Sequence, residues 1–134
     1  MRRHVHELRV RYHECDPQGH LFNAHYLAYF DMAITELWRD ALGGYQAMLD
    51  RGVDMVVAEA NVRYRAPARF DDVVSVTVEV AELGTTSMTT GYEVARDGAV
   101  LATGTLRHVF VDAQAMAKTP IPGDIRALLE AASP

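Results

Sequence analysis

The stretch from Tyr12 to Leu42 decides the fold, and it reads YHECDPQGHLFNAHYLAYFDMAITELWRDAL. Its first third predicts a turn, because the residue before Pro17 is kept out of the helical region and Gly19 permits a further change of direction. Asn23 is a good N-cap, and apolar side chains then recur at helical spacing. They surround the first three turns of this helix, and such a helix is normally buried. Two glycines directly after Leu42 end it.

The rest of the chain alternates between apolar and polar residues, as β-strands do. One such strand, Glu7–His13, precedes the turn, and four follow the helix, at 55–64, 73–80, 87–95 and 100–111. Asp97-Gly98 is a hairpin signal, and Ile125–Ala131 predicts a short terminal helix. We therefore predict an α+β fold in which one antiparallel sheet wraps around a single long central helix, since this buries both apolar surfaces. Valines on the other face of the sheet suggest a subunit interface there.

The bulk composition limits the class of protein. The sequence has 134 residues and a net charge of -5, so we expect one domain over 1–134 and no nucleic-acid-binding surface. No apolar run approaches the roughly 20 residues that cross a bilayer, and no apolar stretch follows the basic N-terminus to make a secretory signal. Cys15 is the single cysteine, which excludes an intrachain disulfide and predicts a cytoplasmic location.

Two segments resemble a known family. Val10–Asp31, VRYHECDPQGHLFNAHYLAYFD, resembles the signature of the 4-hydroxybenzoyl-CoA thioesterase-like acyl-CoA thioester hydrolases, and Val62–Val74, VRYRAPARFDDVV, resembles the segment that follows their helix. The resemblance implies the hotdog fold, in which a sheet wraps one long helix. It also implies an acyl-CoA substrate, no metal or redox cofactor, and dimers that commonly pair into homotetramers, with active sites at the dimer interface.

The resemblance places the catalytic carboxylate at Asp16 and the family's usual asparagine at Asn23. Asp16 would act as general base on a water or attack the thioester carbon directly, and the sequence leaves both open. A helix N-terminus supplies unpaired amides and a positive dipole end, so we expect the amides of Ala24 and His25 to bind the oxyanion. His20 and His25 are candidates for orienting substrate or relaying a proton. Each of these residues also has a purely structural interpretation as part of a turn or cap.

Further residues complete the predicted site. Arg63, Arg65 and Arg69 form a basic set that suits the phosphates of coenzyme A, although a solvated strand face explains them equally well. Gly19, Ala24 and Tyr26 are predicted to line the substrate pocket. His, Cys and Asp side chains occur in the turn without a paired ligand spacing such as CxxC, so we predict no metal site.

Other functions remain alternatives at this point. The same carboxylate and fold would serve a thioesterase that acts on acyl carrier protein thioesters. A hydratase is disfavoured because the motif differs from the Asp/His pattern of hotdog hydratases. A non-catalytic dimer that binds acyl or other hydrophobic ligands would keep its function when Asp16 is changed to asparagine. The residues do not reveal the length of the acyl group or whether it is aromatic.

Overall fold

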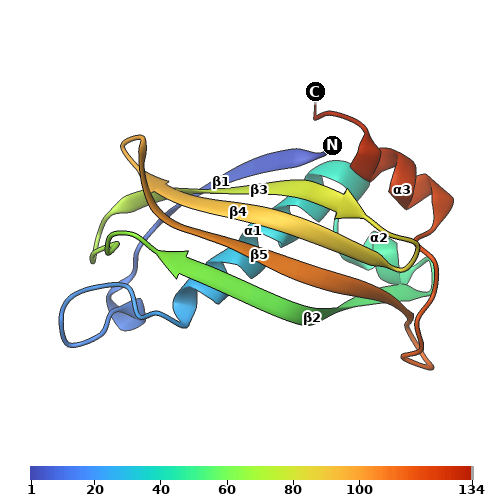
Figure 1. Cartoon of the computed structure of the whole chain (residues 1–134), viewed down its shortest axis with the longest axis horizontal. Coiled ribbons are helices and arrows are strands. Elements are labelled where there is room, and N and C mark those ends of the chain that lie inside the picture. The colour runs from blue at the N-terminus through green and yellow to red at the C-terminus, as the bar shows by residue number, and fades with distance from the viewer. Residues whose placement is uncertain (134) are drawn as a thin grey trace.

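The structure is a computed structural model that describes residues 1–133. One antiparallel sheet wraps around α1 (His25–Leu42), with its strands in the order β1-β3-β4-β5-β2 (Figure 1). The strands are β1 (Arg3–Arg9), β2 (Val53–Tyr64), β3 (Val73–Leu83), β4 (Ser87–Arg96) and β5 (Ala99–Asp112). Two short helices, α2 (Gln46–Leu49) and α3 (Gly123–Glu130), lie near the C-terminal end of α1. The predicted α+β arrangement is therefore confirmed.

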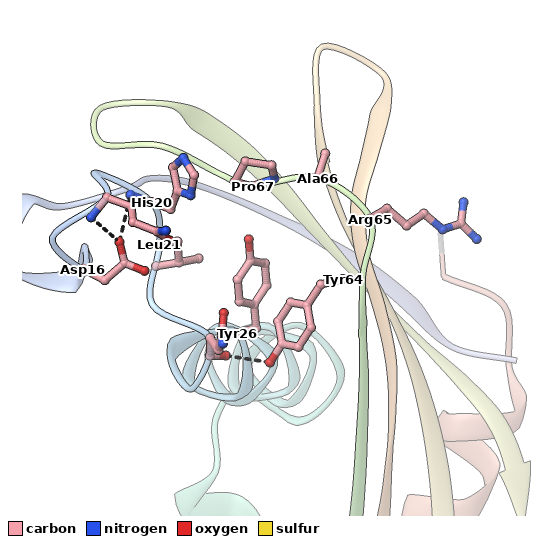
Figure 2. Close-up of a pocket in the computed structure, with 10 residues that line it drawn as sticks. Asp16, His20, Leu21, Tyr26, Tyr64, Arg65, Ala66 and Pro67 are labelled. Atoms are coloured by element: carbon pink, nitrogen blue, oxygen red, sulfur yellow. Dashed lines mark hydrogen bonds between the residues drawn. The ribbon is translucent and has the colours of Figure 1, made fainter.

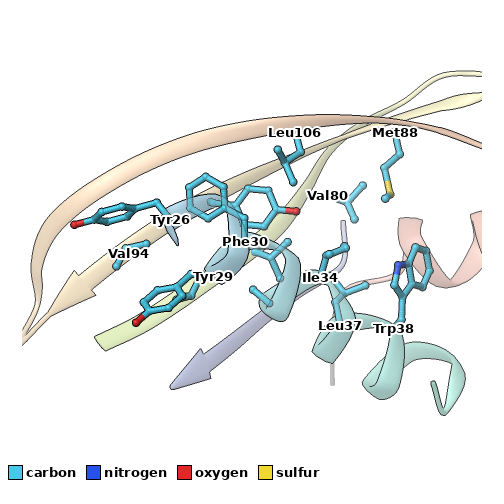
Figure 3. Close-up of a cluster of buried hydrophobic side chains, with 14 of the residues drawn as sticks. Tyr26, Tyr29, Phe30, Ile34, Leu37, Trp38, Val80, Met88, Val94 and Leu106 are labelled. Carbon is cyan, nitrogen blue, oxygen red and sulfur yellow. The ribbon is translucent and has the colours of Figure 1, made fainter. Parts of the chain in front are cut away.

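The inner face of α1 forms the core with the concave face of the sheet (Figure 3). Phe30 is fully buried, and its ring stacks on Tyr92 with 4.4 Å between the centroids. Gly104 of β5 makes this approach possible, because a Cβ there would lie 2.4 Å from the Phe30 ring and 2.5 Å from the carbonyl oxygen of Asn61. A glycine on the central strand thus lets the helix sit directly on the sheet.

The first predicted strand is wrong in its second half. The strand ends at Arg9, and Tyr12–Glu14 form one turn of 3-10 helix instead of continuing it. The cause is the Glu14 carboxylate, which accepts the backbone N–H of Arg11 at 2.8 Å and the hydroxyl of Tyr29 at 2.8 Å. Because the side chain of Glu14 turns inward to reach α1, the alternation seen in the sequence does not correspond to extended backbone.

The predicted cap of α1 is also wrong. The helix begins at His25 with Ala24 in the cap position, and no side chain among the described residues makes a capping hydrogen bond to it. Instead the backbone carbonyls of the preceding turn accept the first amides: His25 N–H donates to Phe22 O at 2.9 Å and Tyr26 N–H to Asn23 O at 3.4 Å. The other end agrees with the prediction, because Gly43 ends the helix in the left-handed conformation at φ 85°.

The prediction of many valines on the outer, convex face of the sheet is wrong. The alternate valines of β3 all lie on the helix side, where they are at most 1% exposed. The outer positions of β3, β4 and β5 carry mainly threonine and charged residues. Exposed apolar surface lies instead on β2, an edge strand in which a bulge between Val57 and Glu59 shifts the alternation. No helix within residues 1–133 is long and apolar enough to cross a membrane.

Candidate active site

The loop between the 3-10 turn and α1 is held by backbone hydrogen bonds on both sides. Asp16 N–H donates to the carbonyl of His20 at 2.8 Å, which closes the loop on itself. Leu21 N–H donates to the carbonyl of Ala68 at 2.8 Å, which ties the loop to the connector between β2 and β3. The position of Asp16 is therefore set by a distant part of the chain as well as by its own turn.

The carboxylate of Asp16 has one engaged and one available oxygen. Its Oδ1 accepts the backbone N–H of Gln18 at 2.8 Å and that of His20 at 3.4 Å. Within residues 1–133, Oδ2 has no hydrogen-bond partner. Gly19 completes the turn with a φ of 77°, a conformation that favours glycine. The side chain is thus fixed in orientation while one oxygen stays free for a water molecule or a substrate carbon.

Asp16 lines a cleft of about 290 Å³ between the loop, the start of α1 and the end of β2 (Figure 2). Tyr26 and Tyr64 form its aromatic wall, edge to face at 5.1 Å between centroids. The Tyr26 hydroxyl accepts the N–H of Ala68 at 3.2 Å, and the Tyr64 hydroxyl donates to the carbonyl of Asn23 at 2.9 Å. The lining residues are Asp16, Gln18, His20, Leu21, Asn23, Tyr26, Tyr64, Arg65, Ala66 and Pro67.

The cleft brings together half of the site residues predicted from the sequence. Those that line it are Asp16, His20, Asn23, Tyr26 and Arg65. Those that do not are Gly19, Ala24, His25, Arg63 and Arg69. The His25 ring packs against Phe22 at 5.9 Å between centroids, outside the cleft. Arg65 contributes from the cleft wall, but its side chain is directed to the side of β2 away from Asp16 (Figure 2).

The expected pair of free amides needs correction. The N–H of His25 is not free, because it donates to Phe22 O at 2.9 Å. The amides of Asn23 and Ala24 have no acceptor in the part of the chain that the structure describes. They lie directly before the helix, where the dipole is positive. The unpaired donors are therefore one residue earlier than expected, because the tight entry into α1 uses the His25 amide.

The sequence analysis did not identify the buried side-chain pair of Glu14 and Tyr29, which lies before the loop. Glu14 is 6% exposed, and its bond to the Tyr29 hydroxyl anchors the chain two residues before Asp16. Burial and the hydrogen bond to Glu14 together raise the pKa of Tyr29, so the hydroxyl stays a donor. Tyr29 reads as one more apolar helix position, and nothing in the local pattern pairs it with Glu14. Tyr64 was also missed, although it belongs to the second family-like segment.

An ion pair fixes the connector that holds the loop. Arg96 of β4 lies 2.5 Å from the carboxylate of Asp72, which also accepts the N–H of Arg69 at 2.8 Å. Burial by itself raises the pKa of Asp72, but the Arg69 amide and the Arg96 guanidinium outweigh it, so the pKa is lowered. Asp72 therefore remains charged and keeps the connector in place beside Asp16.

The thiol of Cys15 is disfavoured as a nucleophile at this loop. Burial, followed by the charges of Asp16 and Glu14, raises the pKa of the Cys15 thiol, which is the wrong direction for a nucleophile. Among residues 1–133, no three His, Cys, Asp or Glu side chains are close enough together to hold a metal ion. The Asp16 carboxylate lines the cleft, and its Oδ2 has no hydrogen-bond partner within residues 1–133.

Comparison with known proteins gives a consistent result. The model of the thioesterase-like superfamily matches residues 10–129. A putative esterase of Aquifex aeolicus (strain VF5) is 30% identical over 107 residues, which cover 80% of this chain and 84% of that protein. The acyl-CoA thioester hydrolase YbgC of Escherichia coli O6:H1 is 35% identical over 81 residues, 60% of each chain.

The similarity extends to three dimensions. The crystal structure of a thioesterase superfamily protein from Jannaschia sp. CCS1 superposes with a TM-score of 0.89 at 27% identity, covering 95% of this chain and 90% of that one. The hotdog fold that the sequence resemblance implies is thereby confirmed.

Proposed function

Because the chain belongs to the thioesterase-like superfamily and is a thioester hydrolase, we propose that it hydrolyses acyl-CoA to a free acid and coenzyme A, with Asp16 as the catalytic carboxylate. The observation that carries the proposal is the free Oδ2 of Asp16 in a cleft beside the unpaired amides that precede α1. A thioester carbonyl placed there meets both groups that its hydrolysis needs.

The proposed reaction has two routes that start from the same geometry. In one, Oδ2 removes a proton from a water, whose oxygen attacks the carbonyl carbon. In the other, Oδ2 itself attacks to form an acyl anhydride, which water then opens. Either way the carbon–sulfur bond breaks and the sulfur leaves as the thiol of coenzyme A after taking up a proton. The proposed mechanism uses no metal or redox cofactor.

The amides of Asn23 and Ala24 are the proposed oxyanion donors. Both are unpaired within the described chain and stand at the positive end of the α1 dipole. Such donors stabilise the negative charge that develops on the carbonyl oxygen more strongly than they bind the neutral carbonyl. His20 lines the same cleft and is the remaining candidate for orienting the substrate or for protonating the leaving sulfur.

We place the acyl group along the apolar surface that continues from this cleft. Tyr64, Val62, Ala60 and Val57 lie on the α1 side of β2, because they pair with the inward-facing positions of β5. Leu27, in the first turn of α1, is 37% exposed and adds to the apolar surface of the chain. An acyl chain or aromatic ring laid there would leave much of its surface in water unless something else covers it.

A second copy of the chain is the proposed cover. β2 is a 12-residue edge strand whose backbone is unpaired on one side and whose Val57 is 51% exposed. A long apolar edge of this kind promotes pairing with another strand unless it is protected. Antiparallel pairing of two β2 strands would bury this edge and close the acyl surface. A solution mass of two chains, or four if dimers pair, is expected, and a stable single chain would contradict the proposal.

The decisive experiment measures kcat/KM for a panel of acyl-CoAs, from short to long and including aromatic acyl groups. Asp16→Asn should lower kcat/KM by about two orders of magnitude or more, because it removes the proton acceptor. Asp50→Asn is the matched control, since Asp50 is an exposed carboxylate outside the cleft. Equal rates for wild type and Asp16→Asn would refute the assignment. Turnover of acyl carrier protein thioesters alone would favour the carrier alternative, and tight binding without turnover would favour the non-catalytic one.

The cytoplasmic location stays a prediction.

A further inference from the structure

Asp16 lines a second cleft besides the one described above. This cleft measures about 470 Å³ and is lined by Tyr12, Cys15, Asp16, Pro17, Gly19 and Phe70. The two clefts share Asp16 and no other lining residue. Gln18 and His20 line the first, whereas the alternate residues Pro17 and Gly19 line the second, so the clefts lie on the two sides of one loop.

Two exposed aromatic rings form the wall of the second cleft. Tyr12 is 80% exposed and Phe70 is 51% exposed, and their rings meet edge to face at 5.6 Å between centroids. Because the two rings adjoin, they expose a contiguous apolar patch, the kind of surface at which ligands bind. Gly19 also lines this cleft, and apart from its chain neighbours no residue in 1–133 has an atom within 4 Å of the place where a Cβ of Gly19 would stand.

The backbone holds both rings in place. Phe70 N–H donates to the carbonyl of Gly19 at 3.3 Å, across the loop itself. Tyr12 opens the 3-10 turn, where its carbonyl accepts the N–H of Cys15 at 3.2 Å. A ligand that lies against the two rings therefore meets a wall whose backbone is already held in place, which lowers the entropy cost of binding.

We propose that this second cleft binds the pantetheine arm of the thioester substrate, an inference that rests on the proposed thioesterase function. A thioester has two arms that diverge from one carbonyl carbon, and Asp16 is the point where the two clefts meet. The first cleft continues into apolar surface and suits the acyl group. The second suits a chain that alternates methylene and amide groups, because its lining combines two aromatic rings with the small residue Gly19. Its volume is in the usual range of ligand pockets.

This placement separates the three arginines predicted to bind the phosphates of coenzyme A. Arg69 directly precedes Phe70, and no carboxylate in residues 1–133 forms an ion pair with it. Arg63 pairs with Thr103 on the convex face of the sheet, and the side chain of Arg65 is also directed away from Asp16 (Figure 2). An arm that leaves through the second cleft brings its phosphate toward Arg69 and away from the other two.

The test compares one acyl group carried on three thiols: coenzyme A, pantetheine and N-acetylcysteamine, which retains only the first amide of the arm. The double variant Tyr12→Ala/Phe70→Ala removes the aromatic wall. Its kcat/KM should fall about tenfold for the coenzyme A and pantetheine thioesters and less than twofold for the N-acetylcysteamine thioester. Arg69→Ala should reduce kcat/KM for the coenzyme A thioester alone, since only that substrate carries phosphate. Met116→Ala, which removes a 55% exposed side chain remote from both clefts, is the control.

Each other outcome has a definite meaning. Equal losses on all three substrates, or no loss on any, would overturn the pantetheine assignment. So would a loss for Arg63→Ala/Arg65→Ala on the coenzyme A thioester with none for Arg69→Ala, because the arm would then leave on the β2 side. A wild-type protein that hydrolyses none of the three thioesters refutes the proposed function itself. If Tyr12→Ala/Phe70→Ala also lowers kcat/KM for acyl carrier protein thioesters, the cleft binds the same pantetheine arm when it is carried by that protein.

Discussion

His108 makes the stability of the fold depend on pH in a way that can be calculated. The side chain lies on β5 under α1 and is 2% exposed, with its Nε2 3.1 Å from the hydroxyl of Thr90. Burial lowers the pKa of His108 to about 4, because the protonated ring would be charged in an apolar core. In the unfolded chain the pKa of a histidine is about 6.5.

The sign and size of the effect follow from these two pKa values. As the pH falls below about 6.5, His108 becomes protonated in the unfolded chain but stays neutral in the folded chain. The free energy of unfolding therefore decreases. The loss continues until the pH reaches about 4, where the folded protein is also protonated. Between pH 7 and pH 4.5 the His108 contribution to the free energy of unfolding should fall by about 2 kcal/mol.

Urea unfolding at pH 7 and pH 4.5, at one protein concentration, measures this change for wild type and His108→Gln. Glutamine keeps a hydrogen-bonding group near Thr90 but does not titrate. The variant should therefore lose about 2 kcal/mol less than wild type on acidification, while the carboxylates of the chain contribute equally to both and cancel. His13→Gln is the control because His13 is exposed. Identical pH dependence in wild type and His108→Gln would refute the account of a neutral, buried ring.

Two further predictions concern the support of the loop and the edge of the sheet. Tyr29→Phe removes the hydroxyl that donates to the buried Glu14 carboxylate and should lower the free energy of unfolding by about 1.5–3 kcal/mol. The control is Tyr45→Phe, at an exposed tyrosine that also bonds a carboxylate, and it should lower the free energy of unfolding by less than about 1 kcal/mol. Equal urea midpoints for the two variants would show that Tyr29 does not hold Glu14. Val57→Asp should shift the mass measured by sedimentation to that of one chain, whereas Val5→Asp, at a 45% exposed valine on the opposite edge strand, should not. The reverse result would place the interface at β1.

Hydrophobic periodicity predicted most of the fold, because in most of the chain the apolar residues of each helix or strand face the core. The valines of β3 alternate without interruption, and the strand is buried on one face in that register. Asp97 and Gly98 both adopt positive φ, at 50° and 79°, as the two-residue hairpin signal requires. The apolar α1 is buried as its composition predicts. In these elements local preference and tertiary packing agree, so the sequence pattern alone is sufficient.

The sequence analysis failed where a side chain makes a distant contact. Glu14 directly follows the alternating run Glu7–His13, but its carboxylate bonds Tyr29, 15 residues later, and the backbone before it forms a 3-10 turn. The bulge next to Val57 has no marker in the sequence, and it moves Val56 to the convex face. The same limit applies to the proposed oxyanion donors, since which amide is left unpaired depends on which carbonyls the fold brings to the start of the helix. A local pattern cannot report an acceptor that the fold brings in.

The surroundings of Asp16 show why a sequence motif can propose a candidate residue but cannot describe the cleft around it. The carboxylate was found from a motif of neighbouring residues, yet its loop is held by Ala68, and the cleft wall opposite is Tyr64. Both lie more than 40 residues away in the sequence: Tyr64 ends β2, and Ala68 lies on the connector that the ion pair between Arg96 and Asp72 keeps in place. Since one carboxylate oxygen is fixed by its own turn and the other faces a cleft built by this connector, chemistry and specificity depend on different parts of the chain. Substitutions in the connector should therefore alter which thioesters are accepted while leaving the Asp16 turn itself intact.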